Sequence, residues 1–221
     1  MRLPQYPDCT YCELHEYAKS VCIPTVHLEE SLKFPAKNVI VFVGQNPGYF
    51  EDQKNEPFIA KSGTLVRKAY VGGCKLNEYA SIFLTNGVRC HTEANETPKP
   101  RHYVACNNYL LQDLTELSKS SDKLIVVTLG APATASMYKN ILGLKRMSLS
   151  EAFNLNGNEH EVAESFKVIV FSTYHPAAVL RNRNHINTIS SHMQLVHDCL
   201  LGTMAVPSEP QIVPTRSPRK E

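Results

Sequence analysis

The sequence lacks features that would place it in a membrane, outside the cell or along the length of a nucleic acid. No apolar run approaches the length of about 20 residues that a membrane span needs, and residues 1–4 do not begin a signal peptide's apolar core. The formal net charge at pH 7 is only +2, too small for a protein that coats nucleic acid through its overall field. We therefore expect an intracellular protein, cytoplasmic or nucleoid-associated and not secreted. We expect no membrane partner, and any contact with nucleic acid must use a local patch.

The seven cysteines are not expected to form a disulfide framework, because intracellular thiols are kept reduced. A chain of 221 residues with 43% hydrophobic residues can bury one substantial core. We expect a single domain over residues 1–204 that acts as a monomer. Residues 205–221 are expected to form a flexible C-terminal tail, because this stretch is rich in proline and poor in apolar residues.

Apolar, β-branched runs alternate with helical patterns along the chain. The predicted buried strands are residues 39–43, 82–84, 124–129 and 168–171. The clearest helical patterns cover residues 103–117 and 188–201, and the polar stretch 154–164 is predicted to be an exposed loop. Such alternation predicts an α/β fold, a three-layer α/β/α sandwich with a central, mostly parallel four-stranded sheet.

Three polar segments directly follow predicted strands. They are Gly-Gln-Asn-Pro-Gly at 44–48, Asn-Gly-Val-Arg-Cys at 86–90 and Thr-Tyr-His-Pro at 173–176. In a parallel sheet all three leave the same edge, here called the motif edge. Open α/β sheets bind ligands beyond the carboxyl ends of their strands. We therefore expect Asn46, Asn86 and His175 to lie close together.

Four cysteines are candidate metal ligands, and together they are called the cysteine set. Cys9 and Cys12 form a Cys-x-x-Cys, and Cys90 and Cys106 complete the four. A zinc ribbon usually supplies two close pairs, whereas a polar loop separates the second pair here, and cysteine-only ligation also suits a 4Fe-4S cluster. Cys90 and Cys106 are alternatively small core residues. The remaining cysteines, expected to be unligated, are Cys22, Cys74 and Cys199.

Taken together, these segments resemble the iron-sulfur uracil-DNA glycosylases, family 4 of the uracil-DNA glycosylase superfamily. The resemblance runs from Cys9 to about Leu200. Its matching parts are the cysteine set, 44–48 with Glu51 and Asp52, Pro57-Phe58 leading to Ser62-Gly63, 85–90, and 173–176 with Leu180-Arg181. The resemblance implies hydrolysis of uracil from single- or double-stranded DNA to leave an abasic site. It also implies that the cysteine set holds a 4Fe-4S cluster, with zinc less expected.

The chemistry of base release assigns roles to the residues at the motif edge. The transition state carries negative charge on uracil, and His175 can donate to the carbonyl oxygen where that charge collects. Asn86 can read the Watson-Crick edge through its amide, and Asn46 can orient the attacking water. Phe58 is placed to stack on the extruded base. The substrate-binding set is completed by Gly44, Gln45 and Gly48.

Contacts with DNA are predicted after the third segment and before a helix. Leu180 is the candidate wedge that fills the gap left by the flipped base. Arg181 and Arg183, with Lys61 and Ser62 at a predicted helix start, are candidate phosphate contacts. A solvated polar loop is the alternative interpretation of the arginine-rich stretch.

Two departures from the family pattern keep other functions open. Gln45 and Asn46 stand where the family commonly has an acidic and a small residue, and Ala177 stands where it has serine. Asn46 resembles the mismatch-specific branch and motivates a glycosylase for other deaminated bases, while Gln45 motivates a non-catalytic DNA-binding module. Glu51 and Asp52 either assist the water or complement a helix dipole, and the second role is favoured.

Overall fold

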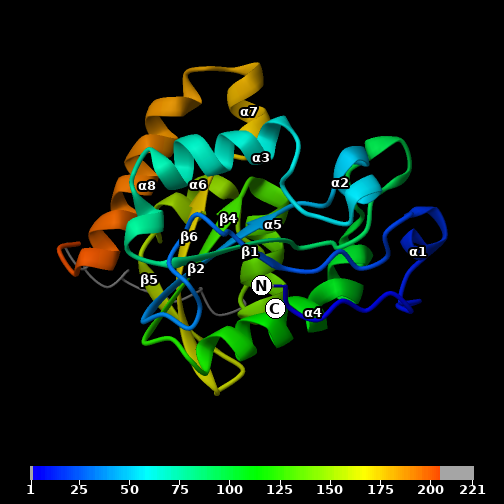
Figure 1. Cartoon of the computed structure of the whole chain (residues 1–221), viewed down its shortest axis with the longest axis horizontal. Helices are drawn as coiled ribbons and strands as arrows, with labels where there is room; N and C mark the ends of the chain where they lie inside the picture. Colours follow the sequence, from blue (N-terminus) through cyan, green and yellow to red (C-terminus); the bar gives the residue numbers. More distant parts are fainter. Residues whose placement is uncertain (1, 205–221) are drawn as a thin grey trace, which may run out of the picture.

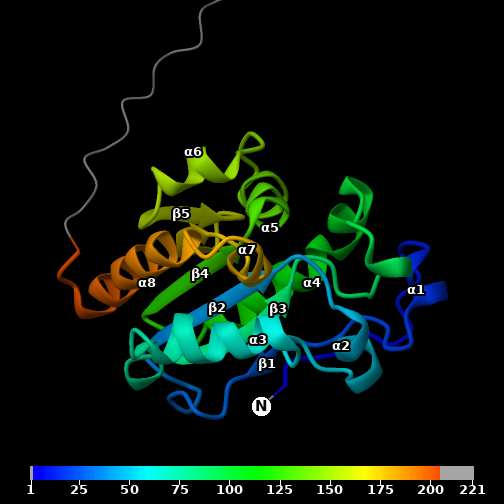
Figure 2. The same ribbon diagram turned by 90° about the horizontal axis from the view of Figure 1, so that it is seen from above.

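The computed structural model describes residues 2–204, which form a twisted sheet covered by helices on both faces (Figures 1 and 2). The predicted flexible tail, residues 205–221, lies outside the described residues. Among the described residues, no helix has the length and apolar character needed to cross a bilayer.

The sheet has six strands in the order β1-β3-β2-β4-β6-β5. The four parallel strands at its centre coincide with the predicted ones: β3 (Ser81–Asn86), β2 (Asn38–Gly44), β4 (Lys123–Leu129) and β6 (Phe166–Thr173). Antiparallel edge strands flank them, β1 (Val26–His27) and β5 (Asn158–Val162). The α/β class is confirmed, but the predicted count of four strands is two too few.

The predicted exposed loop over residues 154–164 is wrong, because β5 lies within it. The sequence of β5 is Asn-Glu-His-Glu-Val, and its two glutamates point to solvent while Val162 is buried. Charged outward positions are typical of edge strands, which must avoid pairing with other chains. The polar composition that suggested a loop therefore belongs to a strand at the border of the sheet.

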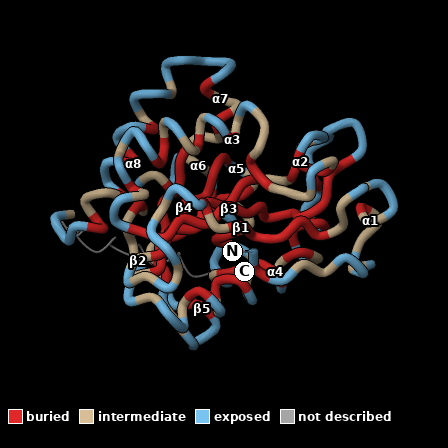
Figure 3. The backbone as a smooth tube through the Cα atoms, viewed as in Figure 1, coloured by how far each residue is buried: buried red, intermediate tan, exposed pale blue. Residues whose placement is uncertain are grey.

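Alternating residues of the central strands face two separate apolar layers. Ile40, Phe42 and Ile82 pack with α8 (His185–Leu201) and the π-helix η1 (Val66–Gly72). The opposite faces of the same strands pack on α4 (Pro100–Ser118) and the π-helix η4 (Met137–Ile141). The sheet is buried on both sides (Figure 3), so the three-layer sandwich is confirmed.

The two helices predicted with the clearest periodicity are α4 and α8, and both enclose the predicted ranges. The shorter helices cluster near strand ends and loops. They are α1 (Leu14–Tyr17), α2 (Tyr49–Lys54), α3 (Lys61–Leu65), α5 (Ala131–Ser136), α6 (Leu149–Phe153), α7 (Pro176–Arg181), η2 (Leu76–Glu78) and η3 (Glu93–Asn95).

Candidate functional site

The three polar segments share one edge of the sheet, as predicted. β2 ends at Gly44 and β3 at Asn86, and these two residues are direct partners in the parallel ladder. β6 ends at Thr173, beside Leu129 of the intervening strand β4. With neighbouring strands about 4.8 Å apart, the distance from β3 to β6 is about 14 Å. The helices that follow β2 and β6, α2 and α7, both lie in the upper half of Figure 1.

Gly44 is enclosed by two predicted substrate-binding side chains. A Cβ atom at Gly44 would lie 2.4 Å from Oδ1 of Asn86 and 2.6 Å from the ring of Phe58. Only glycine fits here, because real Cβ atoms do not approach other atoms so closely. Backbone bonds from Gly87 N to Gly44 O (2.9 Å) and from Val88 N to Gln45 O (3.0 Å) fix the loop that carries Gln45. The structure therefore brings Gly44, Asn86 and Phe58 together.

Phe58 is held in an unusual backbone conformation. Its φ is +58°, in the left-handed region that bulky residues rarely adopt, and its side chain is only 3% exposed. Gly63 of α3 packs directly on this backbone, since a Cβ at Gly63 would lie 1.7 Å from the Phe58 carbonyl oxygen. The start of α3 thus fixes the ring against Gly44. Phe58 also belongs to the apolar core, so the same ring packs in the core and borders the site.

Asn46 is half-buried and its amide has one fixed orientation. Its Nδ2 donates to Pro47 O (3.0 Å) and to Oγ1 of Thr92 (3.3 Å), whose own hydroxyl donates to Glu96 O. Both partners accept from this amide, so Oδ1 is the atom left for a ligand. Nδ1 of His91 donates to the same Pro47 oxygen (3.1 Å). His91 and Thr92 were not predicted as site residues, although they directly follow the second segment.

His175 is the N-cap of α7 and is half-buried. Its Nδ1 accepts a hydrogen bond from Ala177 N (3.2 Å), so the neutral ring carries its proton on Nε2. Burial, and secondly the charge of Arg181, lower the pKa of His175 to about 4. The imidazole is therefore neutral near pH 7 and presents Nε2–H as a donor.

Two residues that the sequence did not single out support the His175 loop. The hydroxyl of Tyr70 donates to Tyr174 O (3.1 Å). Gly130, with φ +84°, lies so close that a Cβ would be 3.0 Å from Cβ of His175, and its N–H donates to Thr173 O (2.8 Å). The sequence offers one signal for a site position at Gly130, which is that this residue directly follows a predicted strand.

Glu51 and Asp52 are buried and occupied by structural hydrogen bonds. Oε2 of Glu51 accepts from Gly48 N (2.5 Å) and completes the first turn of α2. The carboxylate of Asp52 accepts from the backbone N–H groups of Lys19 (3.1 Å) and Ser20 (2.9 Å). This geometry favours the structural role for both side chains, in helix capping and in attaching the N-terminal segment.

Apart from Arg183, which lies in the turn between α7 and α8, the predicted DNA contacts lie on two helices that pack together, α3 and α7. Leu180 is 61% exposed, unusual for a leucine on a helix beside a site. Lys61, Arg181 and Arg183 are also exposed, and within residues 2–204 none of the three forms an ion pair. Ser62 is half-buried at the start of α3. These side chains remain available for a polyanion.

Three members of the cysteine set, Cys12, Cys90 and Cys106, belong to one small apolar cluster. The backbone N–H of Cys22 donates to the sulfur of Cys90 (3.4 Å). Burial raises the pKa of the Cys90 and Cys106 thiols to about 12.

The surroundings of the cysteine set leave room beside one sulfur. Cys9 lines a hollow of about 300 Å³ with Tyr6, Tyr11 and Tyr109. Within residues 2–204, no three His, Cys, Asp or Glu side chains converge closely enough to hold one metal ion as they stand. Cys22, expected to be an unligated thiol, is buried next to Cys90 and lies in the same region.

Comparison with known proteins agrees with this geometry. Residues 33–195, well over half of the chain, match the family model of the uracil DNA glycosylase superfamily. The chain belongs to the uracil-DNA glycosylase superfamily. It is similar to the type-4 uracil-DNA glycosylases of Archaeoglobus fulgidus (32% identity, 78% of each chain) and Thermotoga maritima (29%, 80% of each). The corresponding enzyme of Saccharolobus solfataricus is 28% identical over 79% of this chain and 73% of its own.

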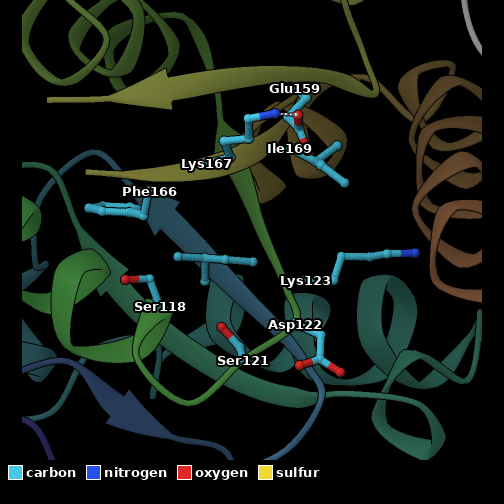
Figure 4. Close-up of a pocket in the computed structure, with 9 residues that line it drawn as sticks. Ser118, Ser121, Asp122, Lys123, Glu159, Phe166, Lys167 and Ile169 are labelled. Carbon is cyan, nitrogen blue, oxygen red and sulfur yellow. Dashed lines mark hydrogen bonds and ion pairs between the residues drawn. The ribbon is translucent and has the colours of Figure 1, made fainter. Parts of the chain in front are cut away.

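The superfamily assignment confirms the enzyme class that the motifs predicted, a DNA-repair glycosylase. A second hollow, of about 290 Å³, lies at the amino ends of β4 and β6 (Figure 4). It is far from the three polar segments at the motif edge. Its walls include Lys123, Phe166 and the ion pair of Lys167 with Glu159 (2.7 Å). Because it lies at the sheet edge opposite the motif edge, it is not part of the glycosylase site.

Proposed function

We propose that this chain hydrolyses the N-glycosidic bond of uracil in DNA and leaves an abasic site. The observation that carries the proposal is the arrangement of Asn86 and Phe58 around Gly44, with His175 on the same sheet edge. The names of its relatives, type-4 uracil-DNA glycosylases, support the same substrate. We expect the protein to act as a monomer on single- or double-stranded DNA inside the cell, in the cytoplasm or nucleoid.

His175 stabilises the leaving uracil. Bond cleavage places negative charge on the base, and a preorganised donor aimed at that charge is usually the largest catalytic contribution. The bond from Ala177 N to Nδ1 keeps the ring oriented and its proton on Nε2. A neutral donor of this kind holds the developing charge without transferring a proton.

Asn86 selects the base. Its amide can donate and accept along the Watson-Crick edge of uracil, and its Oδ1 lies beside Gly44. Cytosine presents the opposite pattern at the same positions and would leave buried polar groups unpaired. Phe58 stacks on the flipped base, because its ring already lies against Gly44 and Asn86.

Asn46 orients the attacking water through Oδ1. Its Nδ2 is held by Pro47 and Thr92, so the carbonyl oxygen is the atom that faces a ligand. An amide does not remove a proton at neutral pH, and the nearby carboxylates Glu51 and Asp52 are committed to backbone N–H groups. Catalysis then rests on positioning and electrostatics.

Contacts with DNA come from the rim formed by α3 and α7. The exposed side chain of Leu180 fills the space of the flipped nucleotide. Arg181, Arg183 and Lys61 contact phosphates, with Ser62 donating from the start of α3. Gln45 and Gly48 complete the wall of the pocket beside Gly44.

We further propose that the cysteine set holds a 4Fe-4S cluster, and the residues present fit it. Four thiols suit anionic sulfur ligands, and three of them, Cys12, Cys90 and Cys106, already lie in one cluster. A single zinc ion would draw its sulfurs to about 2.3 Å from one point. Within residues 2–204 no three of these thiols converge in that way, whereas a 4Fe-4S cluster would give each thiol an iron atom of its own. When bound, the cluster supplies a structural link between the N-terminal segment and the β3–α4 loop.

The test is uracil release from a labelled oligonucleotide with one uracil, comparing wild type with His175→Ala and Asn46→Ala. His197→Ala on α8 is the matched control, because this histidine lies in the helix layer away from the proposed catalytic residues. We expect each site variant to lose about 10²- to 10³-fold in rate, the size of effect seen when one preorganised hydrogen-bonding group is removed. Uracil-containing DNA bound without release by wild type would instead support a non-catalytic DNA-binding module.

Asn46 also supports a second candidate, a mismatch-type glycosylase. Its fixed amide resembles the water-handling asparagine of the mismatch-specific branch. The same assay with thymine opposite guanine, and with deaminated purines, separates the two. Release of thymine at a rate similar to uracil would favour this alternative, because the pocket would then accommodate the 5-methyl group.

A further inference from the structure

Arg89 is among the most deeply buried side chains of the molecule, although it carries a full charge. Its side chain is 1% exposed, and Nη2 forms an ion pair with Oδ2 of Asp113 at 2.6 Å. Asp113 is itself 2% exposed and also accepts from the hydroxyl of Thr25. One nitrogen of the guanidinium is thus anchored on α4.

The other two guanidinium nitrogens are buried without a partner. Among the described residues, Nε and Nη1 of Arg89 find no hydrogen-bond acceptor. Arginine stays charged in proteins, so it cannot reduce the cost of these unpaired N–H groups by losing a proton. Burying charged donors without an acceptor costs free energy. This cost points to an acceptor that the protein chain does not itself provide.

The cysteine set lies next to Arg89 and would supply such an acceptor once it holds a cluster. Arg89 directly precedes Cys90, and its ion pair with Asp113 anchors it on α4, the helix that carries Cys106. Its carbonyl accepts from Ile23 (2.9 Å), the neighbour of Cys22, whose own N–H donates to Cys90 (3.4 Å). The segment that pairs with the Arg89 backbone therefore already donates to one of these sulfur atoms.

We propose that Arg89 is a positioning residue for the cluster: its free Nε–H and Nη1–H groups donate to cluster sulfur atoms, while Asp113, itself held by the Thr25 hydroxyl, keeps the guanidinium in place. This inference rests on the proposed cluster. Four thiolates around iron carry net negative charge, and arginine's planar fork supplies two donors and a compensating charge at once. Hydrogen bonds to sulfur and local charge are the protein's means of tuning such a group.

The experiment compares wild type, Arg89→Met, Arg89→Lys and the control Arg101→Met. Arg101 is also close to the cysteine set but is 61% exposed and pairs with Glu13. For each purified full chain we would measure iron and sulfide content, the iron–thiolate bands in resonance Raman spectra, and the rate at which visible absorption is lost with a chelator in air. Circular dichroism checks folding.

We expect Arg89→Met to bind the cluster but to lose it about tenfold faster than wild type. Its iron–thiolate bands should move to higher frequency, since hydrogen bonds to sulfur weaken these bonds. Arg89→Lys should be intermediate, and Arg101→Met unchanged. If Arg89→Met does not fold, the shift of Arg89→Lys against Arg101→Met decides the question.

Two results would overturn the inference, and they are distinguishable. Wild-type bands and loss rates in a folded Arg89 variant would show that the guanidinium does not touch the cluster, while the cluster itself stands. A wild-type protein that purifies without iron and sulfide, and cannot be reconstituted, would overturn the cluster proposal, and the role of Arg89 with it. Uracil release is measured separately and bears on neither result.

Discussion

Gly63 shows how one absent side chain positions the residue that stacks on the base. A methyl group at this position would lie 1.7 Å from the Phe58 carbonyl oxygen, whereas at Gly72 the nearest atom would be 3.3 Å away. We expect Gly63→Ala to lower the free energy of unfolding by about 2 kcal/mol, as overpacking does. It should also reduce uracil release at least tenfold, because Phe58 must move. Gly72→Ala is the matched control, and equal melting and activity of the two variants would contradict the expectation.

Because of the environment of His175, the rate of uracil excision should not follow the titration curve of an ordinary histidine. Its pKa is lowered to about 4 by burial and by Arg181, so the ring stays neutral through pH 6.5. Protonation at Nδ1 would remove the acceptor of Ala177 N–H. We expect the single-turnover rate to be flat near pH 6.5 and to fall only as pH approaches 4. Arg181→Gln should move this fall to higher pH.

The control for the pH profile is His175→Gln, which keeps a side-chain donor but does not titrate. The rate of this variant should no longer fall at acid pH, although it should be lower than that of wild type at every pH. A wild-type inflection near pH 6.5 that is lost in His175→Gln would show an ordinary, solvated histidine and contradict the proposed environment.

Single residues were predictable where chemistry and strand spacing coincide. Asn86 and His175 lie in short segments that follow predicted strands, so a parallel sheet was enough to place both at the motif edge. Thr92 reaches Asn46, and His91 reaches the Pro47 oxygen, only because the loop after Cys90 folds back over this segment. No local pattern encodes that path. The free nitrogens of Arg89 were equally invisible, because burial depends on the packing of α4.

At the scale of elements, Asp52 joins α2 to the N-terminal segment. It accepts from the N–H groups of Lys19 and Ser20, and Ser20 Oγ donates back to Asp52 O (2.6 Å). We expect Asp52→Asn to lower the free energy of unfolding by about 1–3 kcal/mol, the effect of losing buried hydrogen bonds to a charged group. Release of uracil per folded molecule should be nearly unchanged. Asp122→Asn, an exposed aspartate before β4, is the control.

A rate loss of 100-fold or more in folded Asp52→Asn, at saturating DNA, would contradict the structural role. It would instead make this carboxylate part of the water-activating machinery. Denaturant unfolding and single-turnover excision on the same preparations distinguish the two outcomes.

Elements with a strong hydrophobic period were predicted, and those defined by their position in the sheet were not. β2 and β4 are buried on both faces, and α4 and α8 each carry an apolar stripe. β1 is two residues long, and β5 is polar because it lies at the border. Composition alone does not separate an edge strand from a loop, since both expose most of their residues.

At the scale of the whole molecule, the net charge of +2 predicts that DNA binding depends on a few local cations. If Lys61, Arg181 and Arg183 contact phosphates, log K for duplex DNA should fall with log salt concentration with a slope of about −2.7. Replacing both arginines by glutamine should reduce that slope by about 2 and weaken binding to all sequences alike, because phosphate contacts carry no sequence information.

The matched control for the salt dependence is Lys33→Gln with Lys37→Gln, two exposed lysines before β2, at the sheet edge opposite the motif edge. It removes the same charge from the molecule but none from the rim of α3 and α7. Its slope should remain that of wild type. Equal slopes for the two double variants would mean that the overall field, and not the rim, attracts DNA. That result would remove the support that exposure gives to Arg181 and Arg183 as phosphate contacts, while leaving the roles of His175 and Asn86 to be decided by uracil release.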